Sequence, residues 1–284
     1  MEMQLPIPIE GTIKKRHSVR TYDSKALSPD DRKLLSHYME CLDNPFGVAV
    51  TLHLIDKALN ADGEKLGTYG VIKGATTFLG VSVPDVKYAP LAAGYTFENL
   101  ILCATHMGLG TVWLAATFNR DAFSSAMDIP PEALFPAISP VGYPSSRPSI
   151  TESLMRSAMK SSARKAWDTL FFHADFVTPL TPEDAGAYEP ALEMLRLAPS
   201  AKNVQPWRVR KDGNVYHFYV TYPPKLSRAE IRIKQVDLGI ALSHFHQTAL
   251  AHGFTGAFET IPQDNVILPK DTHYIISWRD APTK

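Results

Sequence analysis

The sequence predicts an α+β protein whose two related halves form an intramolecular pseudo-dimer. The repeat is clearest in two apolar segments: Gly108 follows Gly94 by fourteen residues, and Gly253 follows Gly239 by fourteen. Self-similarity over such a distance indicates internal duplication. Because the pattern occurs in two copies, we interpret it as a fused dimer and not as a solenoid of many repeats.

Each half also contains the same signal for the start of a helix. Leu27-Ser28-Pro29-Asp30-Asp31 corresponds to Leu180-Thr181-Pro182-Glu183-Asp184. Ser and Thr accept hydrogen bonds from the exposed N–H groups of a helix N-terminus, and Pro is favoured in the first turn. We therefore expect a helix to begin at each of these prolines.

Periodicity predicts the remaining elements. Apolar residues at helical spacing over 97–107 predict a helix capped by Gly108, and the pattern over 238–249 predicts its counterpart. Alternation over 48–54 predicts a half-buried strand. Three further apolar runs are expected strands: 78–83, 216–220 and 274–278.

The organisation of the chain follows from the repeat. Residues 135–150 are rich in Pro, Ser and Gly, which indicates an extended connector. We assign residues 1–170 to the first half and 171–284 to the second. The two halves are expected to make one intertwined folding unit, because the site needs both.

The composition argues against several classes of partner. Lys plus Arg and Asp plus Glu both number 29, so no net charge favours nucleic acid or an anionic membrane. No apolar run has the length of a bilayer, and the first residues are too polar for a cleavable signal, so a cytoplasmic location is expected. Cys41 and Cys103 lie in apolar helical patterns and are expected to be buried, inert thiols.

The two halves differ where polar chemistry is expected. From the capping serine to Asn44 is sixteen residues, whereas from the capping threonine to Gln205 is twenty-four. The extra residues include the segment 199–203. The first half instead has Arg16-His17-Ser18-Val19-Arg20 ahead of its helix, and the second half has no basic pair there. Each half keeps a part that the other lacks, as expected for one site built from both.

These segments resemble the FMN-dependent nitroreductase family, in particular a tandem, pseudo-dimeric branch of it. The resemblance covers nearly the whole chain and is carried by four motifs: Arg16-His17-Ser18-Val19-Arg20, residues 199–207, Gly108-Leu109-Gly110-Thr111-Val112-Trp113 and Gly142-Tyr143-Pro144. It implies a nitroreductase-like fold that holds FMN at the interface of two entwined halves. It also implies NADH or NADPH as the electron donor.

The resemblance assigns the FMN phosphate and ribityl chain to basic and hydroxyl groups. Arg16 is the first candidate, because a guanidinium matches phosphate oxygens bidentately. Ser18 adds a hydroxyl donor, and His17 is expected to contribute through its backbone. Arg164 and Lys165 match the family's C-terminal phosphate contact, with a solvated charge pair at a helix end as the alternative.

Two further cations are assigned to the pyrimidine edge of the flavin. Arg20 would stabilise the negative charge that the ring gains on reduction. The alternative for Arg20 is a surface ion pair with Asp23 or Glu40. Lys73 is the second candidate, and a solvated side chain is its alternative.

Small and amide side chains are assigned to the ring face and the polar edge. Pro199, Ser200 and Ala201 are expected to pass close to the ring, where small side chains permit a near approach. Asn203 offers an amide to a ribityl hydroxyl or a pyrimidine carbonyl, and Gln205 either does the same or braces the loop. A polar turn above a core tryptophan is the alternative for this segment.

One more loop is expected near flavin N5 in such a fold. Ala115, Ala116 and Thr117 are its candidates, through backbone N–H groups. A metal site is not expected: His244 and His246 do not share a helix face, and no Cys or carboxylate completes a ligand set.

The predicted function is hydride transfer from NADH or NADPH, through flavin N5, to a small acceptor such as a nitroaromatic or a quinone. Positioning and electrostatics are the protein's expected contribution, so no catalytic acid–base residue is assigned. Two alternatives stay open: a flavin-binding or sequestering protein with little turnover, and a flavoenzyme of the same fold with different chemistry. A monomer is the simplest expectation, with a homodimer as the alternative.

Overall fold

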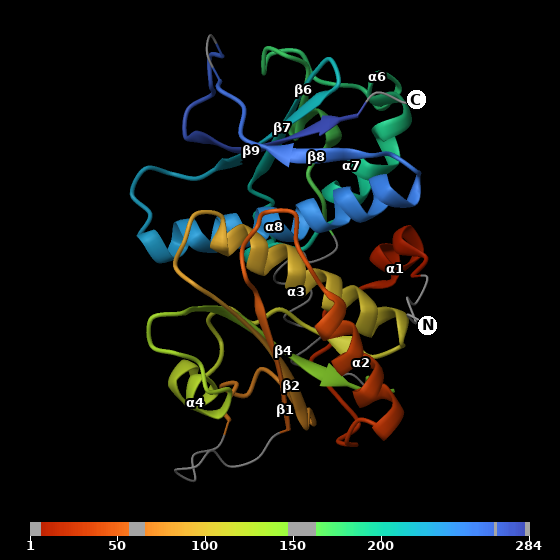
Figure 1. Cartoon of the computed structure of the whole chain (residues 1–284), viewed down its shortest axis with the longest axis vertical. Coiled ribbons are helices and arrows are strands. Elements are labelled where there is room, and N and C mark those ends of the chain that lie inside the picture. Colours follow the sequence, from red (N-terminus) through yellow and green to blue (C-terminus); the bar gives the residue numbers. More distant parts are fainter. Residues whose placement is uncertain (1–6, 57–65, 147–162, 264–265, 282–284) are drawn as a thin grey trace. The chain divides into compact units, whose positions relative to one another are not determined.

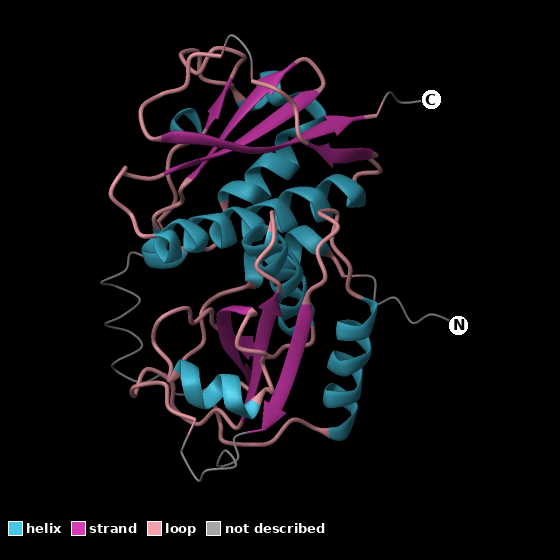
Figure 2. Cartoon of the chain, turned by 60° about the vertical axis from the view of Figure 1, so that its left-hand side comes forward, coloured by secondary structure: helices cyan, strands magenta, loops and turns pink. Residues whose placement is uncertain are grey.

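The chain divides into two compact units, residues 1–161 and 162–284, each with its own sheet (Figures 1 and 2). The structure, a computed structural model, describes residues 7–56, 66–146, 163–263 and 266–281. Within these ranges no helix combines the length and the apolar character that a membrane crossing requires.

The first unit alternates helices and strands. Its elements are α1 (Ile9–Lys15), α2 (Pro29–Cys41), β1 (Thr51–Asp56), β2 (Thr77–Val83), α3 (Ala89–His106), β3 (Gly110–Thr111), α4 (Arg120–Ala126) and β4 (Leu134–Gly142). The four strands form an antiparallel sheet in the order β1-β2-β4-β3. The strand expected from residue 48 begins three residues later, at Thr51.

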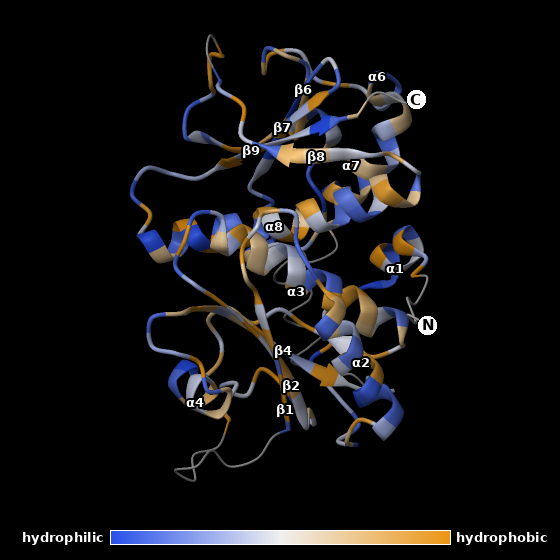
Figure 3. Cartoon of the chain, viewed as in Figure 1, coloured by the Kyte–Doolittle hydropathy of each residue, from blue (hydrophilic) through white to orange (hydrophobic). Residues whose placement is uncertain are grey.

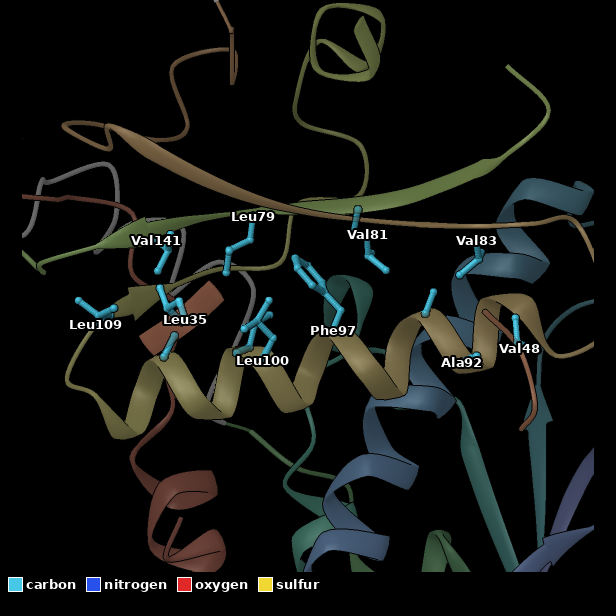
Figure 4. Packing of buried hydrophobic residues seen from close by; sticks show 14 of the residues in the cluster. Leu35, Val48, Leu79, Val81, Val83, Ala92, Phe97, Leu100, Leu109 and Val141 are labelled. Atoms are coloured by element: carbon cyan, nitrogen blue, oxygen red, sulfur yellow. The ribbon is translucent and has the colours of Figure 1, made fainter. Parts of the chain in front are cut away.

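Helix α3 and the sheet enclose the core of the first unit. Every residue of α3 except His106 is buried. Figure 4 shows Phe97 and Leu100 of the helix packed against Leu79 and Val81 of β2. Their burial removes apolar surface from water, which is the dominant favourable term in folding.

The predicted connector 135–150 is wrong for the residues that form β4, which is a buried strand inside the sheet. Prolines misled the prediction, because a central strand normally excludes them. The amide of Ile138 donates to the Leu114 carbonyl (3.0 Å), so the nitrogens of Pro136 and Pro140, each two residues away, face that same side. There β3 has ended, and the Val112 amide donates to Ser139 Oγ instead of a strand carbonyl (3.1 Å). Residues 147–150 lie outside the described ranges.

The second unit repeats this plan with additions at its start. Its elements are η1 (Trp167–Thr169), β5 (Phe171–Phe172), α6 (Pro182–Ala185), η2 (Gly186–Tyr188), α7 (Glu189–Arg196), η3 (Ala201–Asn203), β6 (Trp207–Asp212), β7 (Val215–Thr221), α8 (Arg228–Ala251), β8 (Gly256–Glu259) and β9 (Thr272–Asp280). The strand order is β5-β6-β7-β9-β8, with β5 parallel to β6 and the others antiparallel.

The two sheets agree in register as well as in order. Thr77 pairs with Val141 in the first unit, and the pair 138 residues later, Val215 with Arg279, occurs in the second. Leu79 opposite Ser139 likewise corresponds to His217 opposite Ser277. The tandem repeat expected from the sequence is therefore confirmed at the level of individual pairs.

The central helices end in the same way, as the glycine spacing predicted. Gly108 and Gly253 adopt φ of +81° and +79°, the left-handed region that favours glycine. The next amide reaches back in each case, from Leu109 to the Ala104 carbonyl and from Phe254 to the Ala249 carbonyl. These hydrogen bonds satisfy carbonyl groups that the end of a helix leaves open.

The predicted helix starts are also confirmed. Ser28 Oγ accepts from the Asp31 amide, and Thr181 Oγ accepts from the Asp184 amide, each at 3.1 Å. Helix α2 carries both hydrophilic and hydrophobic residues (Figure 3), and its Leu35 is buried in the core. The expectation for Cys41 is wrong: it is the last residue of α2 and is exposed, while Cys103 is buried.

Candidate functional site

The basic motif of the first unit begins where α1 ends. Arg16 follows the helix, and its side chain is buried beside Glu98 of α3, with 3.6 Å between Nε and Oε1. Among the described residues, the Nε of Arg16 has no hydrogen-bond partner. Glu98 Oε2 accepts from Trp113 Nε1 (2.7 Å), so one fully buried carboxylate faces both an arginine and an indole.

The middle of the motif lies along β3. Ser18 forms a parallel bridge with Thr111, and the Val19 amide donates to the Thr111 carbonyl (2.9 Å). A Cβ at Gly110 would lie 2.8 Å from a methyl group of Val19, so glycine permits this approach. His17 is exposed, with Nδ1 3.1 Å from the Lys15 carbonyl oxygen.

The end of the motif meets the segment that contains Lys73. The Lys73 amide donates to the Arg20 carbonyl, and the Tyr22 amide donates to the Lys73 carbonyl, both at 2.9 Å. Gly74 adopts φ +76°, and a Cβ there would collide with the backbone of Tyr22. Arg20 is buried, with 6% of its surface exposed, and the Lys73 side chain is exposed. Asp23, one of the two ion-pair partners considered for Arg20, lies 3.4 Å from Lys25 Nζ.

The loop assigned to flavin N5 continues from this region. Leu114 bridges Ile138, and the Ala115 carbonyl accepts from Arg120 Nη2 (2.8 Å). Ala116 and Thr117 are exposed. The motif 16–20 is thus joined by backbone pairing to β3 and to residue 73, and the loop 115–117 follows Leu114, which pairs with Ile138 of β4.

The candidate loop of the second unit has an unusual backbone. Lys202, Asn203 and Gln205 adopt φ of +53°, +54° and +48°. Left-handed conformations of residues other than glycine cost about 1 kcal/mol each. Pro199, Ser200 and Ala201 are half-buried and lead into this turn.

Hydrogen bonds inside the loop hold this shape. The Gln205 amide donates to Ser200 Oγ (2.8 Å), and the Asn203 amide donates to the Ser200 carbonyl (2.9 Å). Gln205 Nε2 donates to the Asn203 carbonyl (3.1 Å), and Asn203 Nδ2 donates to the Ala163 carbonyl (3.0 Å). Gln205 is buried, so the side chain braces the loop, which was one of its two expected roles.

Arg164 and Lys165 pack beside the same loop. Arg164 donates through Nε and Nη2 to the carbonyl of Leu197, the C-cap of α7, at 3.1 and 2.9 Å. The Lys165 amide donates to Gln205 Oε1 (2.8 Å), and its Nζ donates to the Gln205 carbonyl (3.3 Å). Burial and the nearby Arg208 lower the pKa of Lys165. Arg164 therefore caps a helix, while Lys165 is hydrogen-bonded to the loop through Gln205.

A residue that the sequence did not reveal also holds the loop. Asp237 of α8 is buried, and its Oδ1 accepts from the Ala201 amide (2.8 Å). Its Oδ2 lies 3.8 Å from Lys234 Nζ and has no hydrogen-bond partner in the part of the chain that the structure describes. Burial raises the pKa of Asp237 from 3.8 to about 7, opposed by the Ala201 amide and by Lys234.

The histidine pair of α8 belongs to the core. His244 is fully buried, with Nδ1 3.0 Å from the Met194 carbonyl oxygen. His246 packs against Phe258 and Trp278, and burial lowers its pKa to about 4. Among the described residues, no three His, Cys, Asp or Glu side chains are grouped as a metal site requires.

A model of the family described as "Putative TM nitroreductase" matches residues 8–249. The chain belongs to this nitroreductase family. No curated protein matched the sequence. A Thermotoga maritima structure described as a "putative nitroreductase" is 18% identical, with 98% of this chain and 96% of that chain covered at a TM-score of 0.63. This likeness confirms the nitroreductase-like fold along the whole chain.

Two further structures each match about half of this chain. A Bacteroides fragilis nitroreductase with bound FMN is 20% identical, covering 50% of this chain and 91% of that chain, with a TM-score of 0.42. An iodotyrosine deiodinase bound to FMN and 3-iodo-L-tyrosine is 17% identical, covering 50% and 91%, with a TM-score of 0.38.

Proposed function

We propose that this nitroreductase-family chain binds FMN and transfers electrons from NADH or NADPH to a small acceptor such as a nitroaromatic or a quinone. Membership of the family over residues 8–249 is the observation that carries the proposal. When bound, FMN would supply the two-electron redox chemistry, and the protein would supply position and charge.

The buried cations of the first unit fit an anionic ligand. Arg16 Nε is buried and finds no hydrogen-bond partner within the described ranges, and a buried N–H that lacks one costs free energy. A phosphate oxygen would satisfy that group, although Glu98 already balances part of the charge of Arg16. Arg20 is held between β3 and residue 73 and would stabilise negative charge at the pyrimidine edge. Ser18 and the backbone of residues 115–117 would add neutral donors.

The loop of the second unit fits the polar edge of a flavin. Its backbone is preorganised by Ser200, Gln205 and Asp237, so binding would not have to order it. Asn203 and Lys165 would contribute an amide and an ammonium group. In this proposal Arg164 does not contact FMN. Its guanidinium caps α7 at Leu197 and so supports the segment that leads into the loop.

A visible absorption spectrum tests the proposal. The purified protein, supplemented with FMN, is expected to show the shifted absorption of bound flavin. Anaerobic NADH or NADPH is then expected to bleach it, and a nitroaromatic or quinone is expected to restore it. Bound flavin that stays oxidised would replace the reductase proposal with a flavin-binding role, and no binding in excess FMN would overturn both.

A matched pair of variants tests the site. Arg20→Ala and Asn203→Ala are expected to weaken FMN binding by about tenfold or more, the effect of losing a hydrogen bond to a charged or polar ligand group. Arg32→Ala is the control, because its guanidinium pairs with Asp56 away from the candidate segments. Equal FMN affinity in all three variants would overturn the assignment of these residues.

A further inference from the structure

We propose that Asp237 is a positioning residue whose ionised carboxylate holds the loop 200–205 in its binding shape and thereby makes FMN affinity depend on pH. The inference rests on the proposed function, because it assumes that this loop contacts FMN. It assigns a role to a residue that lies 32 positions beyond the end of the loop.

The geometry connects Asp237 directly to the start of the turn. Oδ1 accepts from the Ala201 amide at 2.8 Å, immediately before the left-handed residues Lys202 and Asn203. Ser200, on the other side of that amide, accepts the Gln205 amide and so closes the turn. A weaker bond at Ala201 would therefore loosen the segment that carries Asn203.

The second carboxylate oxygen is kept at a cost. Oδ2 is buried and no described residue forms a hydrogen bond with it, so a neutral side chain would avoid the cost of burying this charge. Burial raises the pKa of Asp237 from 3.8 to about 7, so ionising this side chain disfavours the folded state. As the pH rises from below 4 to above 7, the folding equilibrium constant is expected to fall by about a thousandfold. Because the ionised carboxylate lowers stability, we attribute its role to the hydrogen bond that it accepts from the Ala201 amide.

The charges around Asp237 decide the sign of the pH effect. Lys234 on the same helix favours the ionised form. Lys202 of η3 and Glu230 of α8 interact with one another, and on α7 Glu193 and Arg196 form their own pair. As the pH falls through about 7, Asp237 is neutralised, its hydrogen bond with Ala201 loses charge assistance, and FMN affinity is expected to fall.

Asp237→Asn is the test, because it keeps the shape and an acceptor oxygen while removing the charge. FMN dissociation constants are measured for wild type and variant at pH 8 and pH 5.5. The variant is expected to bind about tenfold more weakly at pH 8 and nearly equally at pH 5.5. Titration of the FMN phosphate affects both proteins alike, so the ratio isolates Asp237. A ratio that is unity at pH 8, or the same at both pH values, would overturn the proposal.

Two further measurements keep the test decisive. Amide exchange over 201–205 in FMN-free protein is expected to be faster in Asp237→Asn at pH 8; unchanged exchange would overturn the anchoring role whether or not FMN binds. If exchange is faster in Asp237→Asn but the wild-type protein does not bind FMN, the anchoring role stands and the proposed function is refuted. Lys234→Gln is expected to move the transition in wild-type affinity to higher pH, and provides the test if Asp237→Asn does not fold.

Asp280→Asn is the matched control. It also removes a carboxylate of the second unit, but its partner is Tyr188, whose hydroxyl donates to it at 2.7 Å. FMN affinity and exchange over 201–205 are expected to match wild type at both pH values. A loss equal to that of Asp237→Asn would show a general effect of charge and overturn the specific role.

Discussion

The two units share strand order, register and helix ends, yet the connections between their strands differ. Between β1 and β2 the first unit has a long connection that includes Lys73, whereas β6 and β7 are joined by the two residues Gly213 and Asn214. The long connection pairs with Arg20 and Tyr22. A tight hairpin offers no backbone for a second basic motif to join.

Equivalent positions within the shared framework also have different uses. Ser139 and Ser277 occupy the same place in the two sheets. Ser139 Oγ accepts from the Val112 amide, whereas Ser277 Oγ lies 2.8 Å from His217 Nδ1 and 2.7 Å from the Tyr274 hydroxyl. The comparison teaches that duplication preserved the sheet, while each unit developed separate polar contacts on it.

The largest expected effect separates two buried arginines. Arg210 donates to Tyr219, Gln263 and Asp212 within the second unit. Arg210→Ala would remove its hydrogen bonds to the buried Tyr219 hydroxyl and to the Ala174 carbonyl, and it is expected to lower the free energy of unfolding by about 3 kcal/mol. Denaturant unfolding measures the loss. Arg20→Ala is expected to reduce FMN affinity more than Arg210→Ala does; the reverse order would contradict the division of roles.

Acid is expected to weaken the second unit at a position where the first has no titratable group. Burial, and then Arg210, lower the pKa of His217 from 6.5 to about 4, and its equivalent in the first unit is Leu79. Below pH 6.5 the imidazole of His217 is protonated in the unfolded chain but stays neutral in the folded chain until about pH 4. The free energy of unfolding is therefore expected to decrease by at most about 3 kcal/mol as the pH falls from 6.5 to 4.

His217→Gln measures this contribution, because Asp237 changes stability in the opposite direction in an overlapping range. Unfolding midpoints are measured from pH 7 down to pH 4. Over this fall in pH, the variant is expected to lose less stability than wild type. Parallel curves would show that His217 is not the group responsible.

Two equivalent glycines provide a smaller contrast. Gly110 opposite Gly142 corresponds to Gly256 opposite Asp280. A methyl group at Gly256 would meet the backbone and ring of its own neighbouring strand, whereas one at Gly110 would meet the side chain of Val19. Gly256→Ala is expected to cost about 2 kcal/mol of stability, as overpacking does.

Gly110→Ala is expected to cost less stability but to displace the basic motif and weaken FMN binding. Thermal unfolding and FMN titration of both variants separate the two effects. If Gly256→Ala weakened FMN binding more than Gly110→Ala, the first-unit motif would not be the part that responds to this packing.

The helix caps give the smallest expected difference. Ser28→Ala removes the cap of the thirteen-residue helix α2 and is expected to cost about 1 kcal/mol. Thr181→Ala removes the cap of the four-residue helix α6, whose start is exposed, and is expected to cost about half as much. Chemical denaturation of the single and double variants checks the order, and a larger loss at Thr181 would contradict it.

Local signals were sufficient for much of the framework. The Ser-Pro and Thr-Pro caps and the glycines after the central helices act over a few residues, and each forms as predicted. Strand β4 was missed because the tolerance of Pro140 depends on where β3 ends, and that is a property of the neighbouring strand.

The sequence by itself determined the tandem repeat, the starts of α2 and α6, the glycines that end the central helices and the segments on which polar residues gather, because periodicity and capping are local properties of the chain. The central helices begin earlier than their periodicity predicted, at Ala89 and Arg228. The tertiary structure decided which of those polar groups form contacts that stabilise the fold. Arg16 meets Glu98, Arg164 caps α7, and Asp237 anchors residue 201. These contacts join residues 33 to 82 positions apart. Because they form only when distant segments pack together, a local sequence pattern does not predict them.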